Sequence, residues 1–158
     1  MSDPGDITPE QGKAIVKAAA AWEGTPYALV GIASRQGTGG DCSGSTWQIY
    51  KAAGFDYEYQ PTGSFPGYAI RSRHFREVPA SEAKQEGDIL YWSGHMAIYT
   101  SFADDPPHHT TPRVTKKGVK WTQVNDMWSA THPDGPAYGP GASKFFRSDA
   151  PRVFRYVR

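Results

Sequence analysis

The chain has 158 residues and a formal net charge of +1, so it is long enough for one compact domain with a sizeable core. So small a charge argues against a general attraction to nucleic acid or to an anionic membrane, and no apolar run is long enough to span a bilayer. The single cysteine excludes an internal disulfide and a metal site built from several cysteines. We therefore expect one domain over residues 1–158.

The N-terminal segment 1–7 is predicted to be a flexible lead-in, without the basic start and apolar stretch of a secretory signal. We therefore expect the protein to be made in the cytoplasm and to leave, if it leaves, by another route. A first helix should follow, because Thr8 and Gln11 have the spacing of a capping box and apolar residues recur at helical intervals as far as Trp22. Gly24 marks its end.

The segment 27–40 is irregular and finishes in a glycine-rich turn. A second helix is predicted over 42–53, which contains no proline and is followed by Gly54. The stretch 55–79 is rich in tyrosine, proline and glycine, with a short helix expected around 68–75.

Strands are predicted for the second half of the chain. Residues 89–92 and 95–101 form two of them, joined by a Ser-Gly turn, and 126–131 and 153–157 are further strand candidates. The polar segment 102–120 is expected to be an exposed insertion with a short ribbon near 119–121. Helices first and strands later predict an α+β domain.

Cys42 is the candidate nucleophile, because the segment Gly39-Gly40-Asp41-Cys42-Ser43-Gly44 places it at the start of a predicted helix. Free N–H groups and a partial positive charge at a helix N-terminus favour the thiolate. The same N–H groups can stabilise the oxyanion of a tetrahedral intermediate. The alternative is that this lone cysteine is a small buried hydrophobic residue.

His95 is the candidate base, since imidazole can take and return a proton near neutral pH. It opens the predicted strand 95–101. If the start of that strand lies against the helix of Cys42, the ring can meet the sulfur. The alternative is a surface or capping histidine.

Four blocks occur in a specific order: Thr25-Pro26-Tyr27, Asp41-Cys42-Ser43-Gly44, Glu86-Gly87-Asp88-Ile89-Leu90 and His95-Met96-Ala97-Ile98-Tyr99. This order resembles the NlpC family of cell-wall cysteine peptidases, from about Trp22 to Thr131. The resemblance implies a papain-like fold, with the cysteine-bearing helix packed on an antiparallel sheet. It also implies hydrolysis of amide bonds in peptidoglycan stem peptides, often between D-glutamate and diaminopimelate or lysine, with no metal or organic cofactor.

Carried over by position, the resemblance makes Cys42 the nucleophile and His95 the base. Tyr27 matches a tyrosine beside the cysteine, although ordinary core packing would also explain it. Asp41 and Ser43 flank the nucleophile and are expected to shape a substrate subsite. For Asp41, helix capping is an equally open explanation.

The third catalytic position departs from the family pattern, which usually has a polar residue there, often histidine. The strand 127–131 puts Ser129 at this position, and its hydroxyl can accept a hydrogen bond from the ring but brings no charge. His132 is the alternative orienting residue, although strand parity points it to the opposite face. His109 and Asp126 are also near in sequence. A pair without a third member would still work, because the third group mainly orients the ring.

The insertion 102–120 is longer than the family usually carries. One explanation is a solvated loop. The other is a functional segment that walls the substrate groove or binds a partner protein. His108-His109 lies within it without a supporting metal ligand at a suitable spacing, so no metal site is predicted.

The sequence therefore predicts a monomeric peptidoglycan hydrolase, most simply a bacteriolytic effector toxin that acts in the periplasm or at the cell wall of a target bacterium. Such a toxin, delivered for instance by type VI secretion, would have a cognate immunity protein as partner. The alternatives are a phage lysin or tail hydrolase, a papain-like acyltransferase or deamidase, and a catalytically inactive binding module.

Overall fold

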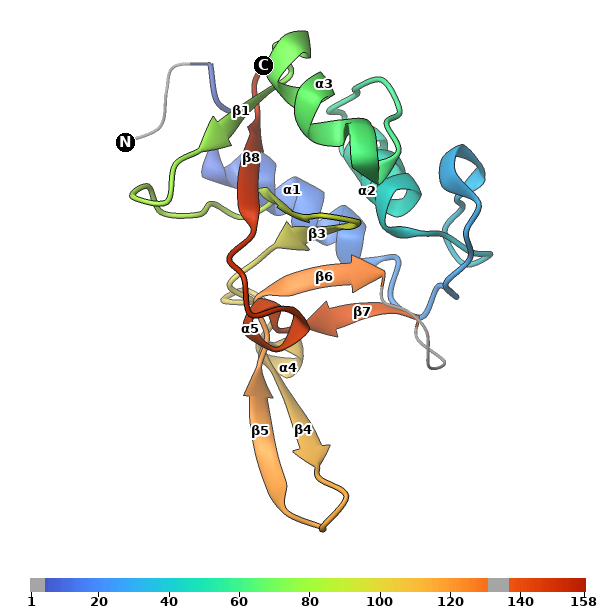
Figure 1. Cartoon of the computed structure of the whole chain (residues 1–158), viewed down its shortest axis with the longest axis vertical. Coiled ribbons are helices and arrows are strands. Elements are labelled where there is room, and N and C mark those ends of the chain that lie inside the picture. The colour runs from blue at the N-terminus through green and yellow to red at the C-terminus, as the bar shows by residue number, and fades with distance from the viewer. Residues whose placement is uncertain (1–4, 131–136) are drawn as a thin grey trace.

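Helices form first and most strands later in the computed structural model, which describes residues 5–130 and 137–158 (Figure 1). The helices are α1 (Pro9–Ala20), η1 (Gly31–Ala33), α2 (Cys42–Ala52), η2 (Thr62–Ser64), α3 (Phe65–Ser72), α4 (Pro106–His109) and α5 (Ser143–Phe146). The strands are β1 (Phe75–Val78), β2 (Ile89–Trp92), β3 (His95–Tyr99), β4 (Thr110–Val114), β5 (Lys120–Val124), β6 (Met127–Ala130), β7 (Tyr138–Gly141) and β8 (Arg152–Tyr156). The predicted α+β class, with cysteine-bearing α2 and an antiparallel sheet, is confirmed.

Helix α1 begins as its sequence predicts. Thr8 Oγ1 accepts from the Gln11 N–H at 3.1 Å, and Gln11 Oε1 accepts from the Thr8 N–H at 2.8 Å, which completes the capping box. The helix ends at Ala20, slightly before Trp22, whose ring is nevertheless buried in the core.

Helix α3 corrects the predicted helix 68–75. It begins earlier, at Phe65, and it ends at Ser72 because Arg73 takes the left-handed conformation, with φ at 64°. Phe75 then starts β1, a strand that the sequence analysis missed. Its four residues pair antiparallel with β8.

Six strands form one antiparallel sheet in the order β1-β8-β2-β3-β6-β7. The β2–β3 hairpin lies near its centre and turns at Gly94, whose φ of 82° suits glycine. Strand β3 ends at Tyr99, before the predicted residue 101, and the chain turns at Phe102, whose φ is 58°. The predicted strands near 126–131 and 153–157 are confirmed as β6 and β8.

Apolar side chains bury both faces of this sheet. Ile89, Met96 and Ile98 join the main core under α1 and α2, whereas Leu90 and Trp92 belong to a smaller cluster on the other face. This division follows the alternation of side chains along a strand. It decides from which side each catalytic candidate approaches the start of β3.

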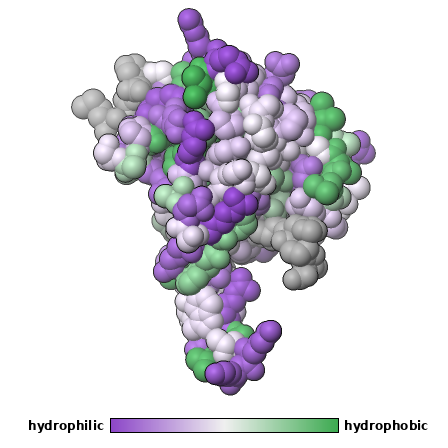
Figure 2. Space-filling view, viewed as in Figure 1, coloured by the Kyte–Doolittle hydropathy of each residue, from purple (hydrophilic) through white to green (hydrophobic). Residues whose placement is uncertain are grey.

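The predicted insertion contains α4 and a two-stranded ribbon, β4–β5, that projects from the rest of the molecule (Figures 1 and 2). The ribbon is longer than the predicted 119–121. Most of its residues are exposed on both faces, so the sequence lacks the alternation that marks a half-buried strand. Within residues 5–130 and 137–158, none of the helices has the length and apolar character needed to cross a membrane.

Candidate active site

Cys42 is the first residue of α2, and its thiol is buried. The carboxylate of Asp41 fixes this helix start: Oδ1 accepts from the Gly44 N–H and Oδ2 from the Gly31 N–H, both at 2.8 Å. The capping explanation of Asp41 is therefore confirmed. The same side chain ties η1 to the helix that carries the thiol.

Cys42 Sγ lies 3.2 Å from the hydroxyl oxygen of Thr62. Burial raises the pKa of the thiol above its ordinary value, although the Thr62 hydroxyl and the Met96 N–H offset part of that rise. Burial thus favours the protonated thiol over the thiolate at this site. Sequence reasoning missed Thr62, which lies in the tyrosine- and proline-rich stretch and carries no motif.

The first turn of α2 leaves the Cys42 N–H available beside the sulfur. The N–H of Gly44 bonds to the Asp41 side chain, and that of Ser45 to the Asp41 carbonyl. Among the described residues, the Cys42 N–H has no acceptor. It can therefore serve an oxyanion that forms next to Sγ.

His95 is the first residue of β3 and is 7% exposed. Its Nε2 lies 2.7 Å from Ser129 Oγ on β6, so the predicted third position does lie against the predicted base. The Phe146 ring of α5 packs on the imidazole with centroids 4.4 Å apart, a contact that the sequence did not indicate. Burial, assisted by the nearby Arg147 cation, lowers the pKa of His95 to about 4.

Cys42 and His95 approach the start of β3 from two sides. The thiol belongs to the core under α2 and faces the Met96 N–H, whereas the imidazole packs with Trp92 and Phe146 on the other side. Within the described part of the chain, no hydrogen bond joins Sγ to the ring. Burial therefore disfavours a thiolate–imidazolium pair here, because it raises the pKa of the thiol and lowers that of the imidazole.

The predicted substrate-side residues surround the start of α2. Tyr27 is half-buried and forms a parallel bridge with Gly40, and the pKa of its phenol is raised by burial and by the nearby Cys42 and Asp41. Ser43 Oγ lies 3.3 Å from Asp41 Oδ1 and 3.1 Å from the hydroxyl of Tyr59. Tyr59 had no sequence signal.

The remaining candidates lie elsewhere. Asp126 caps α5, since its Oδ1 accepts from the Ser143 N–H at 2.7 Å and its Oδ2 from the Ser143 hydroxyl. His109 is exposed at the base of the ribbon. The alternative orienting residue His132 falls outside the described residues. Across residues 5–130 and 137–158, no group of three or more His, Cys, Asp or Glu side chains could hold a metal ion.

No protein-family model and no curated protein matches the chain. Its fold is similar to a crystal structure from Staphylococcus aureus subsp. aureus Mu50 of a protein described as similar to a lipoprotein of the NLP/P60 family, with a TM-score of 0.56 and 21% identity. The match covers 99% of this chain and 45% of that protein, so the chain spans less than half of its neighbour's length. This likeness gives the chain an NlpC/P60-like, papain-like fold.

Proposed function

We propose that the protein is a cysteine hydrolase that cleaves an amide bond in peptidoglycan stem peptides, with Cys42 as nucleophile and His95 as base. The observation that carries the proposal is the His95–Ser129 contact at the start of β3, where the N–H of the next residue, Met96, faces the thiol at the head of α2. An NlpC/P60-like fold supports the substrate class. The bond between D-glutamate and diaminopimelate is the one that the sequence resemblance favours.

In this proposal, the Nε2–H of His95 donates to Ser129 Oγ, which leaves Nδ1 as the proton acceptor. As Sγ attacks the carbonyl carbon, its proton passes to Nδ1 and the carbonyl electron pair moves onto oxygen. The Cys42 N–H stabilises that oxyanion. Collapse expels the amine, which takes the proton from His95, and leaves a thioester on Cys42. Water then attacks the thioester with His95 as base and restores the thiol.

A neutral resting pair fits an attack that is coupled to proton transfer. Burial raises the thiol pKa and lowers the imidazole pKa, so charge separation before substrate arrives is unfavourable. The Cys42 N–H and the His95 imidazole both act once the substrate carbonyl is in place, the first on the oxyanion and the second on the thiol proton. Ser129 is a positioning residue in this scheme, because it acts through the His95 ring.

The substrate-side roles follow the surroundings of the thiol. We propose that Tyr27 and Ser43 contact the stem peptide on either side of the scissile bond. Asp41 acts through the helix start that it caps and through η1. Thr62, at 3.2 Å from Sγ, belongs to the same wall of the site.

Digestion of purified peptidoglycan, followed by mass analysis of the soluble fragments, tests the proposal. We expect the wild type to release fragments cut within the stem peptide and Cys42→Ala to release none. Cys42→Ser, which keeps the shape of the side chain, serves as a second control. Unchanged peptidoglycan in the presence of wild-type protein with a demonstrably reduced thiol would contradict the proposal.

A second candidate is a papain-like acyltransferase. Leu29, Val30 and Ile32 are exposed by 82%, 42% and 61% on the loop that Asp41 ties to the start of α2. An apolar surface of this kind beside a thiol suits an acyl chain. Transfer of an acyl group from a thioester donor to Cys42, with no release of amine from peptidoglycan, would favour this candidate.

The bacteriolytic toxin role, its cognate immunity partner and its action in the periplasm of a target bacterium stay predictions of the sequence. Expression in a Gram-negative host, with and without an added export signal, tests them. The prediction is lysis when the protein is exported and none when it is retained. Exported Cys42→Ala protein is the matched control, because it shows whether export alone damages the cells.

A further inference from the structure

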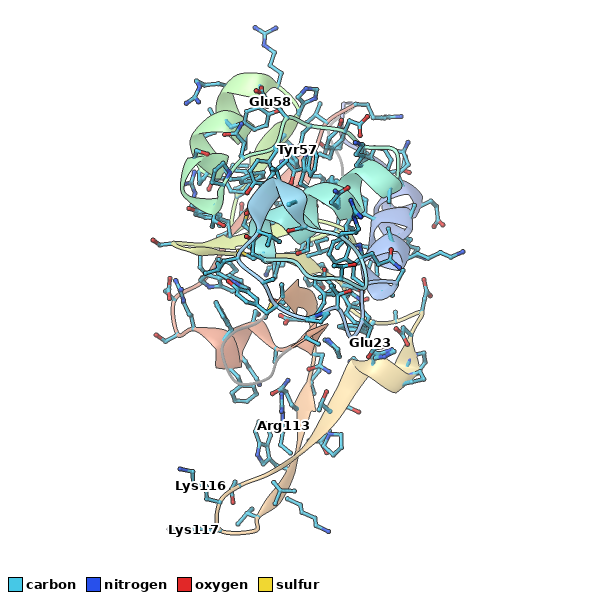
Figure 3. All side chains as sticks on the ribbon, turned by 90° about the vertical axis from the view of Figure 1, so that its right-hand side faces the viewer. Glu23, Tyr57, Glu58, Arg113, Lys116 and Lys117 are labelled. Atoms are coloured by element: carbon cyan, nitrogen blue, oxygen red, sulfur yellow. The ribbon has the colours of Figure 1, made fainter. Side chains whose placement is uncertain are left out.

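The ribbon β4–β5 concentrates positive charge on a molecule of almost no net charge. From residue 106 to residue 125 the chain has no acidic residue and four lysines or arginines, whereas the whole chain has a net charge of +1. Figure 3 shows Arg113 along the ribbon and Lys116 and Lys117 at its tip, away from the body of the molecule. An anion approaching this part of the surface therefore meets a locally cationic projection.

Two exposed aromatic rings meet where the ribbon contacts α5. Trp121 is the cross-strand partner of Arg113, so both lie on one face of the ribbon. Its ring, 37% exposed, meets that of Phe145 on α5, which is 56% exposed, edge to face at 5.0 Å between centroids. Lys144 Nζ lies 5.0 Å from the Phe145 centroid. We call Arg113, Trp121, Lys144 and Phe145 the platform.

Buried polar groups hold the ribbon in place. Arg113 Nε donates to Gln123 Oε1 at 3.3 Å, and Gln123 Nε2 donates to Asn125 Oδ1 at 2.8 Å. Asn125 Nδ2 in turn donates to Thr111 Oγ1 at 2.8 Å and to the His108 carbonyl at 2.9 Å. Gln123 and Asn125 are 5% and 1% exposed, so these bonds fix the orientation of the platform.

The platform is continuous with the candidate active site. Phe145 is followed by Phe146, whose ring packs on the imidazole of His95. Asp126 ties the start of α5 to the turn between β5 and β6. Helix α5 therefore presents Phe146 to the catalytic base His95 and contributes Phe145 to the platform.

We propose that the ribbon and the platform form a second binding site for intact peptidoglycan, apart from the bond that is cleaved. Aromatic rings suit the apolar faces of sugars, and the ribbon cations are complementary to the carboxylates of stem peptides. The identity of the polymer rests on the proposed function.

Sedimentation with purified peptidoglycan sacculi tests the site, using full-length Cys42→Ala protein so that the polymer stays intact. Lys116→Glu/Lys117→Glu in that background is expected to weaken binding about tenfold, and Trp121→Ala by a similar factor. Lys17→Glu/Arg71→Glu is the matched control. It makes the same charge change at two exposed positions on α1 and α3, and it should bind like the parent.

Melting curves and far-UV circular dichroism of every variant exclude loss of the fold as the cause of weak binding. Equal binding by the parent and both folded ribbon variants would overturn the proposal. So would an equal loss in the control, or retention on duplex DNA as tight as on sacculi.

The binding assay stays separate from catalysis. If the folded ribbon variants lose binding while the wild type hydrolyses nothing, the proposed function fails and the binding site stands. If the wild type hydrolyses sacculi but Cys42→Ala does not sediment with them, the binding site fails and the proposed function stands.

Discussion

Ser129 holds one nitrogen of the His95 ring, and this contact sets the ring's orientation. Ser129→Ala should lower kcat about tenfold, because one hydrogen bond to the base is lost and its tautomer is no longer fixed. KM should change little, since Ser129 acts through the ring and not on substrate. Steady-state kinetics on a soluble muropeptide would measure both.

The matched control for that substitution is Ser129→Thr, which keeps the hydroxyl and should restore most of kcat. The melting temperatures of the two variants should differ little, because the alanine substitution removes only one oxygen atom from a buried site. Full activity in Ser129→Ala would mean that His95 works without this partner. A parallel loss of kcat and of the folded state would reduce Ser129 to a packing residue.

Cys42 should react slowly with a neutral electrophile at neutral pH. Its pKa is raised, so the thiolate fraction at a given pH is smaller than that of an ordinary cysteine. The alkylation rate with iodoacetamide should therefore keep rising up to and beyond about pH 9, without a plateau at acid pH. Such a plateau would instead reveal a preformed thiolate–imidazolium pair.

The Thr62 hydroxyl favours the thiolate of Cys42. Thr62→Val should therefore raise the pKa of the thiol further and slow its alkylation at every pH below that pKa. Ser64→Ala, an exposed change in the same short helix η2, should leave the alkylation profile in place. Equal profiles for the two variants would count against the contact between Thr62 and the thiol.

Among the single residues of the site, the sequence predicted those that belong to a motif. Cys42 and His95 stand in two of the sequence blocks, and Ser129 stands where the family resemblance places a third residue. Thr62, Tyr59 and Phe146 reach the same region from segments that have no periodic pattern. Tertiary packing alone brings them there, so no local signal could reveal them.

Helix α2 can start where it does because residue 44 is glycine. A Cβ at this position would overlap both Ser34 Oγ and the Gly31 carbonyl oxygen. Gly44→Ala should therefore cost about 2–3 kcal/mol of unfolding free energy and displace η1 from the helix start. Denaturant titration would measure the loss.

Gly63→Ala is the matched control, because a Cβ there meets nothing within 4 Å. It should change the unfolding free energy by no more than about 0.5 kcal/mol. Equal stability of the two variants would show that the close packing of α2 on η1 does not support the site.

The predicted elements were accurate where one face has a strong pattern. Helices α1 and α2 have capping residues and apolar stripes, and β2 and β3 flank a Ser-Gly turn. Strand β7 was missed because its Tyr-Gly-Pro-Gly sequence reads as a turn, although it pairs with β6 along its length. The ribbon was underestimated because most of its residues are exposed on both faces, so the sequence lacks the alternation of a half-buried strand.

A buried charge cluster away from the thiol ties β8 to the segment that precedes β2. Arg155 on β8 is 2% exposed and donates to both carboxylate oxygens of Asp88 at 2.9 Å and to Glu82 Oε2 at 2.9 Å. Arg155→Ala would leave Asp88 buried without its cation, so we expect a loss of about 3–5 kcal/mol in unfolding free energy.

Arg152 offers the control on the same strand. It pairs with Glu77 through two hydrogen bonds at 2.8 and 2.9 Å, but both side chains are partly exposed. Arg152→Ala should cost at most about 1 kcal/mol. Similar losses in chemical denaturation for the two variants would contradict a structural role for the buried cluster.

The activity that we propose is cleavage of an amide bond within the stem peptide by the Cys42 thiol. The most direct test is to incubate one defined disaccharide–tetrapeptide with wild-type protein and with Cys42→Ala, and to identify the products by mass spectrometry. We predict two fragments separated at the D-glutamyl–diaminopimelate bond with the wild type, and intact substrate with the variant. Intact substrate with both proteins, or the same fragments from both, would contradict the account.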